Sequence, residues 1–175
     1  MSTAEATAPG EHDRPTGLRL RMITIALILA PLLQVFDTSI MSIALRQMQG
    51  SLSATQDQVA WVLTSYLIAV AIMTPLWGAL GGIFGRKRLL LISIAGFIVF
   101  SLLSGTSHTL SEILTYRFLQ GLFGAALIPL ALSALLSNYP PKDFGIAMGW
   151  WGVGIMFGPV VGPTLGGYIT EYWSW

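Results

Sequence analysis

The chain has 175 residues, of which 54% are hydrophobic and 10% charged, and its formal net charge is only +1. A mean hydropathy of +0.70 excludes an ordinary water-soluble globule, because one core of this size could not bury so much apolar surface. The weak charge favours no nucleic-acid partner, and two distant histidines, His12 and His108, without any cysteine provide no metal site, so we expect no cofactor.

In chain order, residues 1–21 are polar and lack a hydrophobic period, which predicts a disordered tail. Five apolar stretches follow, at residues 22–45, 58–80, 89–107, 111–137 and 144–170. Each is near the ~20 residues that cross ~30 Å of hydrocarbon, and the first is too long for a signal peptide. Because an open strand would leave backbone groups unpaired in lipid, we expect an all-α protein with five transmembrane helices.

The basic residues predict the orientation of these helices. Seven of them, Arg14, Arg19, Arg21, Arg86, Lys87, Arg88 and Lys142, fall in the tail and in the second and fourth connections. Only Arg46 falls on the opposite side, so the positive-inside rule places the N-terminus in the cytoplasm. We expect a multi-pass protein of the cell membrane. Four aromatic residues near the outer end, Tyr168, Tyr172, Trp173 and Trp175, are typical of an interfacial belt.

The end of the sequence suggests a truncated protein. The chain stops at an interfacial tryptophan directly after a crossing, and an odd number of helices cannot form two equal inverted halves. We therefore expect an N-terminal fragment that lacks a C-terminal transporter half. The alternative is a natural protein with five membrane spans.

Two ionisable residues lie well inside the apolar stretches, Asp37 in the first and Arg117 in the fourth. Such residues are costly in lipid and usually face a bundle interior or a water-filled cavity. At 1.5 Å per residue, Asp37 lies ~21 Å from Ile23, which leaves it ~9 Å from the outer boundary. The stretch that carries Arg117 starts at the outer boundary, and Arg117 lies ~10 Å in from it. The two residues are therefore at the same depth, so a buried pair is geometrically possible.

This pair has two interpretations. In one, Asp37 and Arg117 neutralise each other as a static clip between helices. In the other, Asp37 is a titratable proton-coupling site, because desolvation favours its neutral form and Arg117 favours its ionised form. Gln34 and Gln120 lie one helical turn from the two charges, where they either contact a substrate or form ordinary interhelical hydrogen bonds.

The fifth apolar stretch contains a regular stripe of glycines. Gly154, Gly158, Gly162 and Gly166 recur at intervals of four, so one helix face lacks side chains and another helix can approach it closely. Pro159 and Pro163 each remove a backbone donor and predict local bending or pliability. A packing face without further duty is the alternative.

Four segments together resemble the major facilitator superfamily. They are LQVFDTSIMSIAL (33–45), GALGGIFGRKRLL (78–90), YRFLQGLFGAALIP (116–129) and GIMFGPVVGPTLGG (154–167). The first is similar to the first-helix signature of the drug:proton antiporters, with Asp37 at its acidic position. The third is similar to the fourth-helix Arg-x-x-Gln-Gly motif, and the last, with Gly167 at its end, is similar to the fifth-helix motif that marks exporters.

The second segment is similar to the loop motif between helices two and three, and it departs from the family at two positions. Gly82 and Ile83 stand where the motif has Asp and Arg, so a carboxylate expected to steady the cytoplasmic gate is missing. The retained motif residues are Gly78, Leu80, Gly85, Arg86 and Lys87. The basic residues also have a simpler interpretation, since they could act only as topological charge.

The resemblance implies five of the six helices of an N-terminal transporter domain, in the fourteen-helix drug-export branch. It implies proton-coupled export of small amphipathic or cationic compounds by alternating access, with protons, substrate and lipid as partners. Two alternatives stay open, a carrier of a defined metabolite and a non-transporting membrane module. An enzyme is not expected, because no nucleophile, base and orienting group can be placed together.

Overall fold

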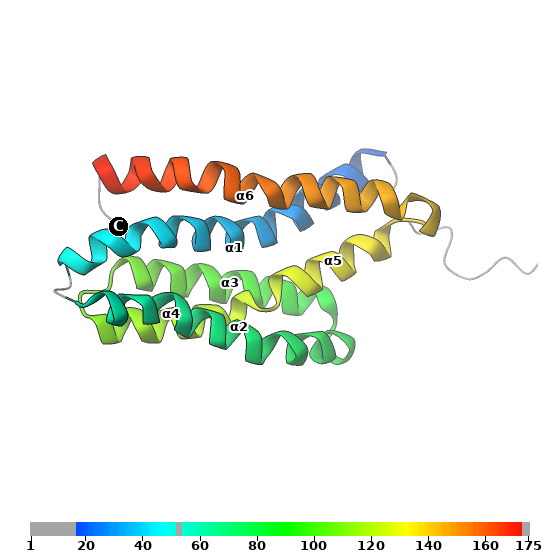
Figure 1. The fold of residues 1–175 in the computed structure, drawn as a ribbon. Helices are drawn as coiled ribbons and strands as arrows, with labels where there is room; N and C mark the ends of the chain where they lie inside the picture. The colour runs from blue at the N-terminus through cyan, green and yellow to red at the C-terminus, as the bar shows by residue number, and fades with distance from the viewer. Residues whose placement is uncertain (1–16, 52–53, 173–175) are drawn as a thin grey trace, which may run out of the picture.

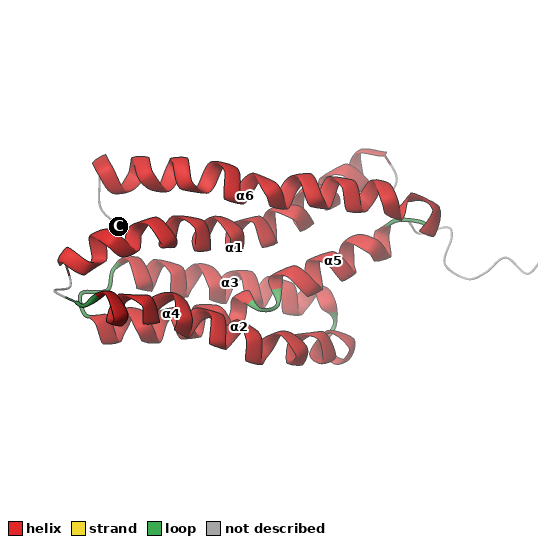
Figure 2. Cartoon of the chain, viewed as in Figure 1, coloured by secondary structure: helices red, strands yellow, loops and turns green. Residues whose placement is uncertain are grey.

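The computed structural model describes residues 17–51 and 54–172, and these ranges fold into helices with short connections (Figures 1 and 2). The elements are α1 (Gly17–Ser51), α2 (Gln56–Phe84), α3 (Arg86–Gly105), α4 (Leu110–Gly124), α5 (Leu127–Asn138), the 3-10 turn η1 (Pro141–Asp143) and α6 (Phe144–Tyr172). Five helical stretches are long and apolar enough to cross a membrane, if α4 and α5 count as one. The expected all-α class with five membrane helices is confirmed.

The first helix begins earlier than the sequence suggested. α1 starts at Gly17, so residues 17–21, which were assigned to a disordered tail, are helical. Leu and Arg are good helix formers, which explains why this segment continues the helix. Residues 1–16 of the expected tail lie outside the described residues, as do Trp173 and Trp175 of the aromatic cluster.

The second connection is a single residue rather than a loop. α2 runs to Phe84 and α3 begins at Arg86, so the basic residues expected in a loop lie in the first turn of α3. Gly85 between them has a φ of +86°, a conformation that glycine adopts without steric cost. This one residue reverses the chain direction. The predicted loop was therefore longer than the connection in the structure.

The fourth apolar stretch is broken, contrary to the prediction of one helix over residues 111–137. The break falls at Ala125 and Ala126, between α4 and α5. Pro129 explains it, because proline has no N–H to donate to the carbonyl of Ala125 and its ring would clash there. The N–H of Ala126 instead bonds to the carbonyl of Phe123 at 3.2 Å.

The helices form two groups joined by α5. α1 packs lengthwise along α6, and α4 packs against both α2 and α3, while α5 crosses between the groups to contact α1 (Figure 1). Large apolar side chains cover the outside, and many are more than half exposed, among them Leu29, Ile72, Leu91, Val99 and Val160. Such a surface is unfavourable in water and suits the hydrocarbon of a membrane.

Candidate functional site

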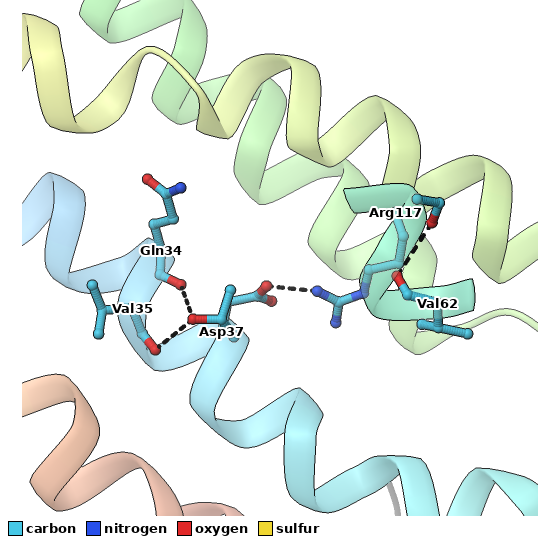
Figure 3. A network of polar contacts seen from close by, with 7 residues as sticks. Gln34, Val35, Asp37, Val62 and Arg117 are labelled. Carbon is cyan, nitrogen blue, oxygen red and sulfur yellow. Dashed lines mark hydrogen bonds and ion pairs between the residues drawn. The ribbon is translucent and has the colours of Figure 1, made fainter. Parts of the chain in front are cut away.

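Asp37 of α1 and Arg117 of α4 point toward each other and form an ion pair (Figure 3). Arg117 Nη1 donates to Asp37 Oδ2 at 2.5 Å, and the two side chains are only 6% and 11% exposed. The two side chains therefore form the buried pair that their matching depths allowed. Removing one partner of such a pair strands a buried charge, which typically costs ~3–5 kcal/mol.

Gln34 and Gln120 are buried close to the ion pair but are not bonded to it. Within the described ranges, Gln34 Oε1 and both amide atoms of Gln120 have no hydrogen-bond partner. The side chain of Gln34 points away from the Asp37 carboxylate in Figure 3. Unpaired amides in a buried position favour a site that accepts a ligand or water, so the cavity-lining role of these residues stays a prediction.

Tyr66 of α2 is a buried polar residue that the sequence analysis did not single out. It is 1% exposed, and its hydroxyl has no hydrogen-bond partner among the described residues. The phenol lies beside Gln34 and within electrostatic range of both Asp37 and Arg117. A tyrosine in the middle of an apolar stretch, rather than at an interface, was the available signal.

Asp37 also borders a small cavity between α1 and α3. The cavity has a volume of about 230 Å³. Its walls are Leu33, Asp37, Ile40, Phe97, Ile98, Ser101 and Leu102. The carboxylate therefore lies at the edge of an apolar space and is not sealed in packed protein.

The glycine stripe of α6 faces α1, as the spacing predicted. A Cβ atom on Gly162 would lie 2.6 Å from the Cβ of Ser39, and one on Gly166 would lie 3.2 Å from the Cα of Ile40. Gly154 and Gly158 meet Ile28 and Val35 in the same way. The stripe thus packs directly against the segment of α1 that carries Asp37.

The remaining residues of this helix motif lie elsewhere on α6. A Cβ on Gly167 would meet nothing within 4 Å. Pro159 and Pro163 are exposed, and α6 runs uninterrupted through both of them. The pliability expected from the prolines stays a prediction.

The retained gate residues gather at the turn between α2 and α3. Gly78 and Leu80 lie in the last turns of α2, whereas Arg86 and Lys87 begin α3 as exposed side chains. Ile83, at a position where the family motif is charged, is 75% exposed. The described residues contain no group of three His, Asp or Glu side chains that could hold a metal ion.

Trp77 of α2 makes a hydrogen bond to α4 near its C-terminal end. Trp77 Nε1 donates to the carbonyl of Leu122 at 2.6 Å. In a continuous helix the N–H of Ala126 would donate to the carbonyl of Leu122, but at the break it donates to the carbonyl of Phe123. Trp77 therefore satisfies a carbonyl that the break leaves free, two residues after Gln120.

The sequence of the chain is similar to those of known proteins. Residues 11–175 match the model of the Major Facilitator Superfamily. The chain is 40% identical over 161 residues to the multidrug export protein EmrB of Haemophilus influenzae and 40% identical over 160 residues to the probable multidrug resistance protein EmrY of Escherichia coli. It is 37% identical over 159 residues to the fatty acid resistance protein FarB of Neisseria gonorrhoeae.

These alignments cover 91% of the chain but only 32%, 31% and 31% of the three relatives. The chain thus spans about a third of the length of the curated relatives that it matches.

Proposed function

The chain belongs to the Major Facilitator Superfamily, and from this premise we propose that it serves proton-driven export of small amphipathic or cationic compounds. The names of its relatives EmrB and EmrY refer to multidrug export and multidrug resistance. The five apolar helices support a multi-pass membrane protein, and membership of this family supports a transporter rather than an enzyme.

The ion pair between Asp37 and Arg117 is the observation that carries the proposal. A carboxylate in a nearly buried site changes its charge when it takes up a proton, and it then loses its attraction to the neighbouring guanidinium. Proton binding would therefore favour a conformation in which the two helices are less tightly held. A ligand shifts such an equilibrium by its differential affinity for the two states, which is the requirement for coupling.

Polar side chains beside the pair would link proton binding at Asp37 to substrate binding. Gln34, Gln120 and Tyr66 offer unpaired polar atoms beside the pair. All three side chains are buried within this chain, so a substrate in the central site that alternating access requires would reach them only after the helices around the pair move apart. The glycine contact between α1 and α6 would let α6 shift against the segment that carries Asp37.

The orientation completes the proposal. The basic residues Arg86, Lys87 and Arg88 lie at the end of the bundle where α1 begins, which supports a cytoplasmic N-terminus in a cytoplasmic membrane. The gate at this turn would operate without the usual acidic residue, because Gly82 and Ile83 replace the charged pair of the family motif.

The test uses the complete protein, reconstituted in vesicles. An imposed proton gradient should drive movement of a cationic dye in the wild type, and Asp37→Asn should abolish that movement while the protein stays inserted. Asp57→Asn is the matched control, since Asp57 is exposed in the first turn of α2. Undiminished gradient-driven movement in Asp37→Asn would overturn the coupling role.

A further inference from the structure

Two buried polar atoms beside the ion pair lie near each other without a hydrogen bond. They are Tyr66 Oη of α2 and Gln34 Oε1 of α1, and neither has a partner among the described residues. The phenol lies beside Gln34 and within electrostatic range of Asp37. Leaving a buried hydroxyl unpaired is costly, because it can both donate and accept a hydrogen bond. Its presence here therefore calls for an explanation.

Close packing holds the phenol of Tyr66 in place. A Cβ on Gly121 of α4 would lie 2.6 Å from the carbonyl oxygen of Tyr66, so α2 and α4 approach each other closely at this residue. At the other end of the side chain, a Cβ on Gly124 would lie 3.0 Å from Tyr66 Oη and 3.2 Å from the ring of Phe97. The side chain is 1% exposed, so the hydroxyl has no access to solvent and a fixed position between α2, α3 and α4.

Phe97 of α3 also connects this hydroxyl with Asp37. Its ring lies beside the position of the Tyr66 hydroxyl, and it lines the small cavity that Asp37 borders. The side chain of Gln34 lies one turn before Asp37 on α1 and points away from the carboxylate (Figure 3). A group on Asp37 would therefore reach the free oxygen of Gln34 through an intermediate, and the Tyr66 hydroxyl lies near both residues.

Arg117 is the charged group that Asp37 contacts on a neighbouring helix. The other charged residue in the apolar stretch of α4, Glu112, is exposed in the first turn. The apolar stretches of the other neighbouring helices contain no Asp, Glu, Lys or Arg, at residues 58–84, 89–107, 127–138 and 144–170. When a proton neutralises Asp37, the attraction to Arg117 is lost, and these stretches provide no second charge in its place.

Proton uptake also changes the hydrogen bonds that Asp37 can make. The ionised carboxylate has acceptors alone, and one of them is used by Arg117. The protonated carboxyl gains an O–H donor, which needs an acceptor of its own in a buried site. Tyr66 Oη is an unpaired acceptor in this region, and its own O–H has no acceptor among the described residues.

We propose that Tyr66 is a positioning residue for the proton on Asp37. Protonated Asp37 donates its O–H to Tyr66 Oη, and the Tyr66 O–H donates to Gln34 Oε1, so all three groups gain a partner. No covalent bond changes apart from the O–H bond that the incoming proton forms on Asp37. The hydroxyl thus contacts the protonated state and not the ionised one, which is the differential interaction that shifts an equilibrium. This inference rests on the proposed function, because it takes Asp37 as the residue that binds the proton.

Infrared difference spectroscopy of the complete protein in lipid nanodiscs tests this hydrogen bond. At acid pH the spectrum should contain a carboxylic C=O band that Asp37→Asn lacks. Tyr66→Phe should move this band to higher wavenumber, because the C=O stretch of a carboxylic acid rises when the acid makes fewer hydrogen bonds. Tyr139→Phe is the matched control, since the Tyr139 hydroxyl pairs with Thr24, and it should leave the band in place.

Unfolding of the complete protein in detergent gives an independent measurement. Asp37→Asn imitates the protonated residue, because its amide has a donor in place of the acid O–H and an oxygen that still accepts from Arg117. Tyr66→Phe should not raise the equilibrium constant for unfolding in the wild-type background. In the Asp37→Asn background it should raise this constant about tenfold, or ~1.4 kcal/mol, because a hydrogen bond is lost. Tyr139→Phe should have the same effect in both backgrounds.

Two results would overturn this inference alone. One is an Asp37 band that Tyr66→Phe leaves unmoved, and the other is an equal effect of Tyr66→Phe on unfolding in both backgrounds. The band itself would still show a proton on Asp37, so the proposed function would stand. A spectrum without an Asp37 band at every acid pH at which the protein stays folded would overturn both the inference and the proton-coupling role.

Discussion

Gly158 of α6 lies directly against Val35 of α1, two residues before Asp37. The two helices are closely packed here, because a Cβ on this glycine would overlap the Val35 side chain. The most extensive helix contact in the bundle therefore includes the segment that carries the buried carboxylate. Any motion of α6 along α1 would act on the surroundings of Asp37.

The first prediction concerns this contact. Gly158→Ala should lower the free energy of unfolding by ~1–3 kcal/mol, because an added methyl group forces packed helices apart. Gly152→Ala is the control, since a Cβ on Gly152 would meet nothing within 4 Å. Thermal unfolding in detergent measures both. Equal melting temperatures for the two variants would contradict the close packing of α1 and α6.

The second prediction concerns the break between α4 and α5. Trp77→Phe should destabilise the protein by ~1–3 kcal/mol, because it leaves the partly buried carbonyl of Leu122 without its donor. Phenylalanine keeps most of the apolar contact, so the loss reports mainly the hydrogen bond. Unfolding by heat or denaturant checks the prediction, and an unchanged stability would show that another group satisfies Leu122.

Tyr66→Phe tests the opposite situation. The hydroxyl of Tyr66 is buried without a hydrogen-bond partner among the described residues, so its removal should leave stability unchanged or raise it by up to ~1 kcal/mol. The same unfolding assay serves, with Trp77→Phe as the contrasting aromatic variant. A clear loss of stability would show that the hydroxyl is bonded in the protein, through water or a rearranged side chain.

The sequence predicted the helices and the ion pair because both depend on strong local signals. Apolar length identifies a membrane helix, and the matching depths of Asp37 and Arg117 follow from the rise per residue. The break after Gly124 does not interrupt the apolar pattern, which continues through it, and Pro129 is the only local signal of it in the sequence. The contacts of Tyr66 and Trp77 depend on how three helices cross, which periodicity in one segment does not determine.

The fourth prediction concerns topology. Reporter fusions after Arg88 and Lys142 should report the cytoplasm, and fusions after Gly50 and His108 the exterior, because the sequence has seven basic residues in the tail and in the second and fourth connections and one in the first connection. Paired reporters that are active on opposite sides of the membrane give the measurement. The reversed pattern would place the N-terminus outside and would contradict the proposed orientation.

The last prediction separates the two interpretations of Asp37 and Arg117, and it uses the complete protein. Arg117→Ala should cost ~3–5 kcal/mol of stability if the remaining carboxylate stays charged, because the partner of a buried charge is lost. Asp37→Asn also leaves a buried charge, that of Arg117, but we expect a smaller loss, because asparagine has a similar size and keeps a side-chain oxygen that can accept a hydrogen bond from the guanidinium. Unfolding of both variants beside Asp57→Asn measures this order.

The double replacement of Asp37 and Arg117 by apolar residues of similar volume, Leu and Met, then decides the role of the pair. Well-packed apolar residues often replace a buried ion pair without loss of stability, so the double variant should insert and unfold much like the wild type. If the pair is only a clip between α1 and α4, gradient-driven efflux should survive as well. If Asp37 carries the coupling proton, efflux should be lost in a normally inserted protein, because no titratable group remains to respond to the gradient. We expect the loss, and retained efflux would assign the pair to packing alone.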